Sequence, residues 1–297
     1  MFRDEPFGQF ARPDIPLRNI AKKLGVDKET IRNRIKRFKE TGFLSSPMLL
    51  PNPNLFDINE IRLRFDVPSY LSKDDLMRKI RLIPGVDLII NHYGNSMFVG
   101  FFSETEQSVK KTIELISRIS NTENLFRIDY VSPECKIKLS KTDWSIMKSL
   151  QKDPGKTYAV VSRELGISSR TVKRRLERLV DAKALTLTWS YDLKAVDGTV
   201  VSLTVFYANP EQRAEINQRI LSHFNDCLLR TDFNNKSYGV FNLIILNIAK
   251  THEITAWMKE QPGVSNFRAD VIQDLIYLWE PFQEMFDRKL AQIRVLA

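Results

Sequence analysis

The chain has 297 residues, enough for two or more domains that each bury a core of their own. Its composition is that of a globular protein, its first ten residues are too charged for a secretion signal, and no apolar run approaches the roughly 18 residues of a membrane span. We therefore expect a cytoplasmic protein.

The formal net charge is +9 at pH 7, and most of it lies in two stretches. Residues 17–39 hold nine Lys or Arg against two acids, and residues 158–185 hold seven against three. Basicity that is local indicates a surface for binding a polyanion.

Cysteine and histidine are too few and too scattered to indicate a metal site or a catalytic centre. Cys135 and Cys227 stand far apart and are expected to be reduced thiols, while His92, His223 and His252 occupy unrelated positions. The sequence also lacks the motifs of nucleotide-binding loops, nucleophile elbows and zinc sites. We expect no metal, no cofactor and no enzymatic activity.

The first basic stretch predicts a helix-turn-helix. Ile31, Ile35 and Phe38 repeat at helical spacing, Gly25 is placed to end the preceding helix, and Asp27 is placed to cap the next one. Helix, short glycine turn and capped helix in this order are typical of the motif.

The β-capable run FLSSPMLLPNPNLF follows and predicts a wing. We therefore place a winged helix-turn-helix domain in residues 1–50. Its first helix is degenerate, because Pro6 and Gly8 interrupt the segment that would form it.

Residues 51–133 predict a ferredoxin-like domain. INEIRLRFDV alternates as a strand, SKDDLMRKIRLI has helical spacing, and VDLIINHYGNSMFVGFF breaks at Gly94 and Asn95 as a hairpin does. A helix, ETEQSVKKTIELISRI, and a strand, NLFRIDYV, complete the order βαββαβ.

The rest of the chain repeats this plan at an offset of 141 residues. LGVDKETIRNRIKRF aligns with LGISSRTVKRRLERL, and FRID at 126–129 aligns with FRAD at 267–270, without insertion. We interpret the chain as a tandem duplication of the α+β class. The second winged helix-turn-helix occupies residues 134–192 and the second ferredoxin-like domain residues 193–277.

Each ferredoxin-like sheet has one face without helices. Phe65 and Phe101 in the first copy, and Phe206 and Phe241 in the second, suggest an aromatic strand surface that needs a cover. We therefore expect the two sheets to pair.

Residues 278–297 predict a C-terminal amphipathic helix. Its apolar stripe consists of Phe282, Met285, Phe286, Leu290 and Ile293. One alternative is a helix that caps its own sheet. Our hypothesis is that it replaces the degenerate first helix of the N-terminal winged domain.

The outward faces of the two recognition helices carry an excess of cations with few acids in reach, which favours contact with DNA over a salt-bridged surface. We expect Arg32, Asn33, Lys36, Lys173 and Arg174 to reach the groove. Arg34 and Arg175 lie nearer the core and are assigned to phosphate contact or to structure. The full set of candidate DNA-binding residues is Lys28, Arg32, Asn33, Arg34, Lys36, Arg37, Arg170, Lys173, Arg174, Arg175 and Arg178.

These two units, each with a βαββαβ segment behind LGVDKETIRNRIKRFKETGFLS or LGISSRTVKRRLERLVDAKALT, resemble the leucine-responsive regulatory protein/AsnC family of bacterial and archaeal transcription regulators. The resemblance implies a sequence-specific regulator of double-stranded DNA. Family members dimerise through the βαββαβ sheets, so this chain would be a covalent pseudo-dimer with two unequal recognition helices, able to form homo-oligomers through the ferredoxin-like domains.

The resemblance also implies a small-molecule effector site at the loops HYGNSM and FNNKSYG. The family's glycine and acidic residue before the third strand are not matched there. The candidate effector-binding residues are Tyr93, Gly94, Asn95, Asn235 and Lys236.

Two alternatives remain open. Siroheme decarboxylases resemble the same family in fold and occur as fused units, but they need a histidine-rich, arginine-lined pocket. The other alternative is a scaffold or effector-sensing module that does not bind DNA, which the salt dependence of binding would distinguish.

Overall fold

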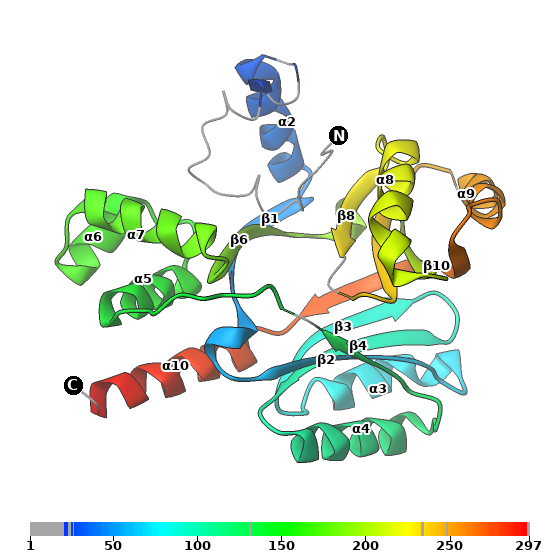
Figure 1. Ribbon diagram of the computed structural model, residues 1–297, viewed down its shortest axis with the longest axis horizontal. Helices are drawn as coiled ribbons and strands as arrows, with labels where there is room; N and C mark the ends of the chain where they lie inside the picture. The colour runs from blue at the N-terminus through cyan, green and yellow to red at the C-terminus, as the bar shows by residue number, and fades with distance from the viewer. Residues whose placement is uncertain are drawn as a thin grey trace.

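The computed structural model describes residues 21–22, 25, 27–130, 132–232, 235–247 and 249–295 (Figure 1). The degenerate first helix predicted near the N-terminus lies outside the described residues, as does most of the helix predicted before Gly25.

The first half of the chain forms α2 (Lys28–Glu40), β1 (Leu44–Pro51), β2 (Asn59–Asp66), α3 (Lys73–Ile80), β3 (Val86–His92), β4 (Ser96–Ser103), α4 (Glu106–Ser120) and β5 (Phe126–Tyr130). The second half forms α5 (Lys141–Lys152), α6 (Tyr158–Leu165), α7 (Ser169–Asp181), β6 (Leu185–Tyr191), β7 (Thr199–Tyr207), α8 (Arg213–His223), β8 (Leu228–Asp232), β9 (Tyr238–Ile245), α9 (Lys250–Lys259), β10 (Val264–Tyr277) and α10 (Glu280–Val295). The predicted α+β class, with winged helix-turn-helix and ferredoxin-like βαββαβ segments, is confirmed.

Eight strands form one sheet in the order β5-β2-β4-β3-β10-β7-β9-β8. The first four are the strands of one βαββαβ segment and the last four are those of the other, each in the same internal order. The two sheets therefore join edge to edge through β3 and β10, whereas the expected pairing was one in which they cover each other's helix-free faces.

Strand β10 makes this junction because it is long. Its first part pairs with β7 from Val264 to Val271, and its second part pairs with β3 from Ile272 to Tyr277. At the 141-residue offset, Pro133 occupies the place of a residue in this second part, and proline cannot donate to a strand ladder. The corresponding strand β5 ends at Tyr130, so the junction forms on one side only.

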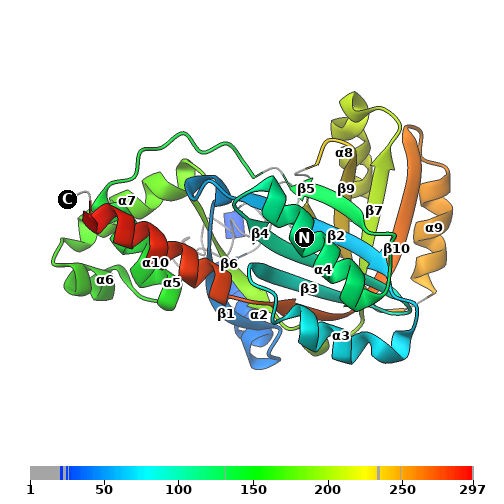
Figure 2. The same cartoon turned by 90° about the horizontal axis from the view of Figure 1, so that it is seen from below.

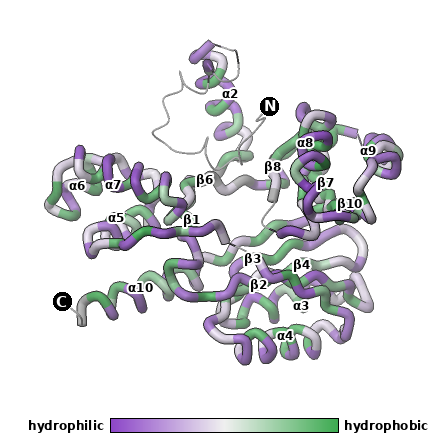
Figure 3. The backbone as a smooth tube through the Cα atoms, viewed as in Figure 1, coloured by the Kyte–Doolittle hydropathy of each residue, from purple (hydrophilic) through white to green (hydrophobic). Residues whose placement is uncertain are grey.

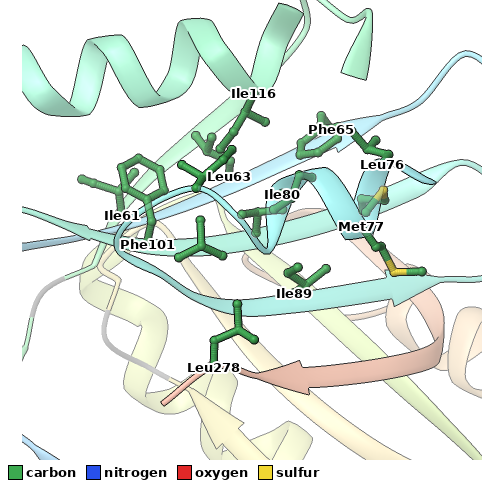
Figure 4. Packing of buried hydrophobic residues seen from close by; sticks show 14 of the residues in the cluster. Ile61, Leu63, Phe65, Leu76, Met77, Ile80, Ile89, Phe101, Ile116 and Leu278 are labelled. Carbon is green, nitrogen blue, oxygen red and sulfur yellow. The ribbon is translucent and has the colours of Figure 1, made fainter. Parts of the chain in front are cut away.

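Helices α3 and α4 cover one face of the first half-sheet, and the hydrophobic core lies beneath them (Figure 4). Phe65 and Phe101 belong to this core. Phe241 belongs to the equivalent core under α8 and α9. The expectation that these aromatic side chains form the helix-free surface was therefore wrong; Phe206 alone of the four lies outside both cores, beside the ring of Tyr238 at 5.9 Å.

The helix-free faces carry charge where the two half-sheets meet. Arg64 on β2 donates to Asp270 on β10 at 2.6 Å, and Arg268 on β10 donates to Asp66 on β2 at 3.3 Å. Strands β2 and β10 are not neighbours in the sheet, so these ion pairs require the sheet to curve and bring its two helix-free faces toward each other (Figure 2).

The predicted wing segments are strands β1 and β6, and they pair with each other. Their antiparallel register runs from Leu44 opposite Tyr191 to Pro51 opposite Leu185. Leu49 of β1 is buried in the core of the second winged domain with Trp144 and Leu187. The two-stranded sheet of β1 and β6 thus joins the segment that follows α2 to the second winged domain, across the centre of Figure 1.

Helix α10 is amphipathic: hydrophobic and hydrophilic residues alternate along it in Figure 3. It lies along α5, where Phe286 is fully buried, and Lys148 of α5 pairs with Asp287 (Figures 1 and 2). Its first turn packs on the first half-sheet, with the ring of Phe282 4.9 Å from that of Phe102.

The hypothesis that α10 replaces the first helix of the N-terminal winged domain was therefore wrong, because α10 packs on the first helix of the second winged domain. It does not cap its own sheet either, since Phe102 belongs to the first half-sheet. In the described part of the chain, none of the helices is both long and apolar enough to span a membrane.

Candidate DNA interface

The second helix-turn-helix is built from α5, α6 and α7. Gly166 ends α6 with a φ of +65°, a left-handed conformation that favours glycine, and Ser168 caps α7 by accepting a hydrogen bond from the Thr171 amide at 3.1 Å. Val172, Leu176 and Leu179 then face the core with exposed fractions of 2% or less. Burial of this stripe fixes which side of α7 turns outward.

The outward side of α7 carries Arg170, Lys173 and Arg174, which are all exposed. No carboxylate pairs with these three side chains in the described part of the chain. Their charge is therefore available to an anion approaching this surface.

Arg175 and Arg178 of α7 are held differently, by the carboxylate of Asp143 on α5. Arg175 Nη1 donates to Asp143 Oδ1 at 2.9 Å and Arg178 Nη2 donates to Oδ2 at 2.6 Å, while Asp143 itself is fully buried. Burial alone would raise the pKa of Asp143, but hydrogen bonds from Ser140 and Arg175 and the charge of Arg178 bring that pKa below its ordinary value. Asp143 is thus a carboxylate held in its charged form.

Sequence reasoning missed Asp143. The signal that could have found it is the S-x-x-D pattern of Ser140 and Asp143, which predicts a reciprocal cap at the start of α5. The structure contains that capping box, with the Ser140 amide donating to Asp143 Oδ2 at 2.8 Å.

Helix α2, which the sequence predicts to be the first recognition helix, begins in the same way. Gly25 has a φ of +64°, and Asp27 accepts a hydrogen bond from the Thr30 amide at 2.8 Å. Hydrogen bonds from Thr30 hold the pKa of Asp27 below its ordinary value. Ile31 is buried, so the predicted cap and the first position of the predicted inward stripe are both present.

The outward side of α2 carries exposed Lys28, Arg32, Asn33, Lys36 and Arg37. Two of the cations have helix neighbours as partners: Arg32 pairs with Glu29, and Lys36 lies 3.6 Å from Glu40. With 52% and 70% of these two side chains exposed, the pairs are weak surface contacts that a phosphate can replace. Arg34 is half-buried, like Arg175 at the same place in α7.

The candidate effector residues lie in two hairpins that this chain keeps apart. The amide of Tyr93, beside Gly94 with its φ of +74°, donates to Val271 O at 2.9 Å. The other hairpin joins the far end of the second half-sheet, where the Tyr207 amide donates to Ser237 O at 3.0 Å and Tyr207 pairs with Val264. Seven strand residues, about 23 Å, separate Val264 from Val271 along β10.

Within these hairpins, Tyr93 is exposed, Asn95 O accepts from the Val67 amide at 2.9 Å, and Asn235 Oδ1 accepts from the Ser237 amide at 2.8 Å. Lys236 is exposed. Tyr93 and Asn95 thus contact neighbouring segments through their backbones, Asn235 contacts its own loop and Lys236 faces solvent, and the two sets do not form one site within the chain.

The general model of winged helix-turn-helix DNA-binding domains matches residues 139–183, which span α5, α6 and α7. These residues are a winged helix-turn-helix DNA-binding domain. This match supports a DNA-binding regulator and the resemblance to leucine-responsive/AsnC-type regulators that the sequence predicts. A search of curated protein sequences finds no match.

Among solved structures, the siroheme decarboxylase NirDL is similar over 97% of this chain and 98% of its own, with 14% identity and a TM-score of 0.57. NirDL in complex with an iron-uroporphyrin III analogue gives 14% identity and a TM-score of 0.56 over the same shares. E. coli AsnC is similar over 46% of this chain and 94% of its own, with 13% identity and a TM-score of 0.36. At such identities the likeness to NirDL shows a common fold.

Proposed function

We propose that the chain is a sequence-specific regulator of double-stranded DNA that acts as a covalent pseudo-dimer, with α2 and α7 as two non-identical recognition helices. The observation that carries the proposal is the exposed cationic face of α7 within residues 139–183, the part that matches the DNA-binding model. A protein α-helix fits the major groove, where Arg and Lys bind guanine edges and Asn binds adenine.

The proposed base-reading residues are Arg32, Asn33 and Lys36 on α2 and Lys173 and Arg174 on α7, all of which are exposed. Lys28, Arg37 and Arg170 are proposed to contact phosphate. Arg34 is proposed for phosphate or structure, while Arg175 and Arg178 are left out of the contact set because Asp143 binds them.

The shared sheet of β1 and β6 supports two readers that act together. It ties the wing segment of each winged domain to that of the other, so α2 and α7 are parts of one body. The tandem origin of the two halves, and domain boundaries near residues 50, 133, 192 and 277, are part of the same proposal.

The test is fluorescence anisotropy of the full chain on mixed-sequence duplex DNA, titrated across a salt series. Two variants, Arg32→Ala/Lys36→Ala and Lys173→Ala/Arg174→Ala, each remove two cations from one recognition helix. Binding to mixed-sequence DNA is mainly electrostatic, so on this DNA the same four cations act through phosphates even though they are proposed to read bases at a specific site. Each variant is therefore expected to lower the slope of log affinity against log salt by up to about 1.8, and to weaken binding about tenfold or more near 0.1 M salt.

Lys110→Ala/Lys111→Ala is the matched control, because it removes two exposed cations from α4, on the sheet face away from both recognition helices. It should leave the slope within about 0.5 of the native value. Binding that is insensitive to salt, or that the control weakens as much as the test variants do, would count against the proposal.

The siroheme decarboxylase reading remains the second candidate, because NirDL shares the fold over nearly the whole chain. The three histidines lie in three separate places: His92 is buried between the half-sheets, His223 stacks on Trp257 with ring centroids 4.1 Å apart, and His252 is exposed. Titration with iron-uroporphyrin III tests this reading, since a saturable change in the porphyrin absorbance would favour it.

A small-molecule effector at the two hairpins and homo-oligomerisation through the ferredoxin-like domains are proposed on the resemblance alone. Because the hairpins lie apart in one chain, an effector site that used both would need a second copy. Sedimentation velocity with and without candidate amino acids would test both statements together.

A further inference from the structure

The side-chain cluster around Asp143 contains two arginines of a recognition helix and one buried carboxylate. Asp143 accepts four hydrogen bonds in all: from Arg175, from Arg178, and from the amide and hydroxyl of Ser140 at 2.8 and 2.6 Å. Three of these donors bind Oδ2 and one, Arg175, binds Oδ1, so each carboxylate oxygen has a hydrogen-bond partner. Both arginines thus bind an internal partner, with which a DNA phosphate would have to compete.

We propose that Asp143 is a positioning residue that holds Arg175 and Arg178 away from DNA and thereby limits how many phosphates the second winged domain binds. The inference rests on the proposed function, since it concerns DNA binding by α7. A residue on α5 would thereby control how much positive charge α7 offers to DNA.

The orientation of Arg175 indicates that Asp143 sets it. Besides Asp143, Arg175 Nη1 reaches the Ser140 hydroxyl at 3.0 Å, while its Nε is buried and has no hydrogen-bond partner in the described part of the chain. An arginine that leaves a buried N–H unpaired sits where its other contacts hold it, because an unmade buried hydrogen bond is costly.

If Arg175 and Arg178 were released from Asp143, both guanidinium groups would reach the surface without any refolding of α7. Arg178 keeps 49% of its side chain exposed and Arg175 keeps 28%, although both bind a carboxylate that is fully buried. In the native chain, a phosphate would have to replace charge-assisted hydrogen bonds of 2.6 and 2.9 Å that salt screens less than it screens an exposed pair.

The amino-acid sequence of the first unit does not repeat an aspartate at the position of Asp143. At the 141-residue offset, Phe2 stands in the place of Asp143, while Arg34 and Arg37 stand in the places of Arg175 and Arg178. Arg37 is exposed on α2.

The test measures the salt slope of DNA binding for the full chain with and without this carboxylate charge. Asp143→Asn keeps the size of the side chain but replaces one acceptor oxygen by a donor, so at least one arginine loses its partner. The expected result is tighter binding, several-fold near 0.1 M salt, and a slope steeper by about 0.9 for each new phosphate contact, thus by 0.9 to 1.8.

Arg175→Gln/Arg178→Gln completes a double-mutant cycle. In the native background the double variant should change the slope by less than about 0.9, the value for one phosphate contact, because Asp143 already holds these two arginines. In the Asp143→Asn background it should abolish the gain. A cycle with no coupling, or a loss of nearly two phosphate contacts in the native background, would overturn the proposal.

Far-UV circular dichroism checks that each variant is folded. If Asp143→Asn fails to fold, the arginine pair in the native background decides the question by the same criterion. Failure of the proposed function gives a different result, because the native chain and every variant would then bind DNA without a salt-dependent slope, which would overturn both statements.

Discussion

His92 is a buried ionisable residue at the junction of the two half-sheets. Its side chain is 2% exposed, its backbone pairs with Ile272 of β10, and its carbonyl accepts from Lys73 Nζ at 2.7 Å. Burial lowers the pKa of His92 to about 4; the charge of Asp270 opposes this, and the cations Arg64, Lys73 and Arg268 add to it. The folded chain therefore keeps His92 in its neutral form.

This pKa predicts a loss of stability in acid. Between pH 6.5 and 4 the unfolded chain protonates His92 while the folded chain does not, so the free energy of unfolding falls as pH falls through that window. The full loss assigned to His92 is about 3 kcal/mol. Urea denaturation of native chain and His92→Gln at pH 7, 5.5 and 4.5 measures it, and the variant is expected to lose less stability on acidification.

His252→Gln is the control for this measurement, because His252 is exposed and its replacement should leave the pH dependence unchanged. Parallel curves for the native chain and His92→Gln would mean that His92 is protonated in the folded state, contrary to the prediction.

At the scale of elements, α10 completes the second winged domain. Phe286 is fully buried, with its ring 6.1 Å from that of Trp144 on α5 and 5.4 Å from that of Phe56. A helix that buries its apolar face on another helix gains most of its stability from that contact. Loss of α10 would therefore act on α5 first.

Phe286→Ala is expected to destabilise the second winged domain by about 3 to 5 kcal/mol through the cavity that it leaves. Hydrogen exchange followed by mass spectrometry should show lost protection in α5 and α7, with α2 little changed. Gln292→Ala, at an exposed position of the same helix, is the control and should stay within about 0.5 kcal/mol. Lost protection centred on α2 would contradict this assignment.

The elements that the sequence predicted correctly depend on local chemistry. The caps at Asp27 and Ser168 and the hairpin at Gly94 were confirmed because each requires only neighbouring residues. The length of β10 was not predicted, although Leu275, Ile276 and Tyr277 are themselves suited to a strand.

The contacts that sequence reasoning could not supply are those between distant segments. Pairing of Leu49 with Leu187 in β1 and β6, and burial of Phe286 on α5, depend on which surfaces meet in space. Helical spacing gave the apolar stripe of α10 but not its partner. In the candidate site, the helical pattern separated exposed Arg174 from half-buried Arg175, but it could not supply Asp143, the common partner of Arg175 and Arg178, which lies 32 residues from Arg175.

At the scale of the whole molecule, two strand pairings join the halves. Strands β3 and β10 join the half-sheets, and β1 and β6 join the winged domains. A single chain with both pairings ties α2 and α7 together. On the proposal that both helices bind DNA, the site should therefore have two half-sites at one spacing, as for dimeric helix-turn-helix proteins.

Because the half-sites are read by different side chains, a selected site should be an imperfect palindrome. Glu29, Arg32, Asn33 and Lys36 of α2 stand where α7 has Arg170, Lys173, Arg174 and Glu177. Selection of bound duplexes from a random pool measures this, and perfectly symmetric sites would contradict it.

A matched variant gives α2 the outward side chains of α7. It carries the substitutions Glu29→Arg, Arg32→Lys, Asn33→Arg and Lys36→Glu. Its selected sites should become more symmetric, with the α7 half-site unchanged, because only the α2 reader has been altered.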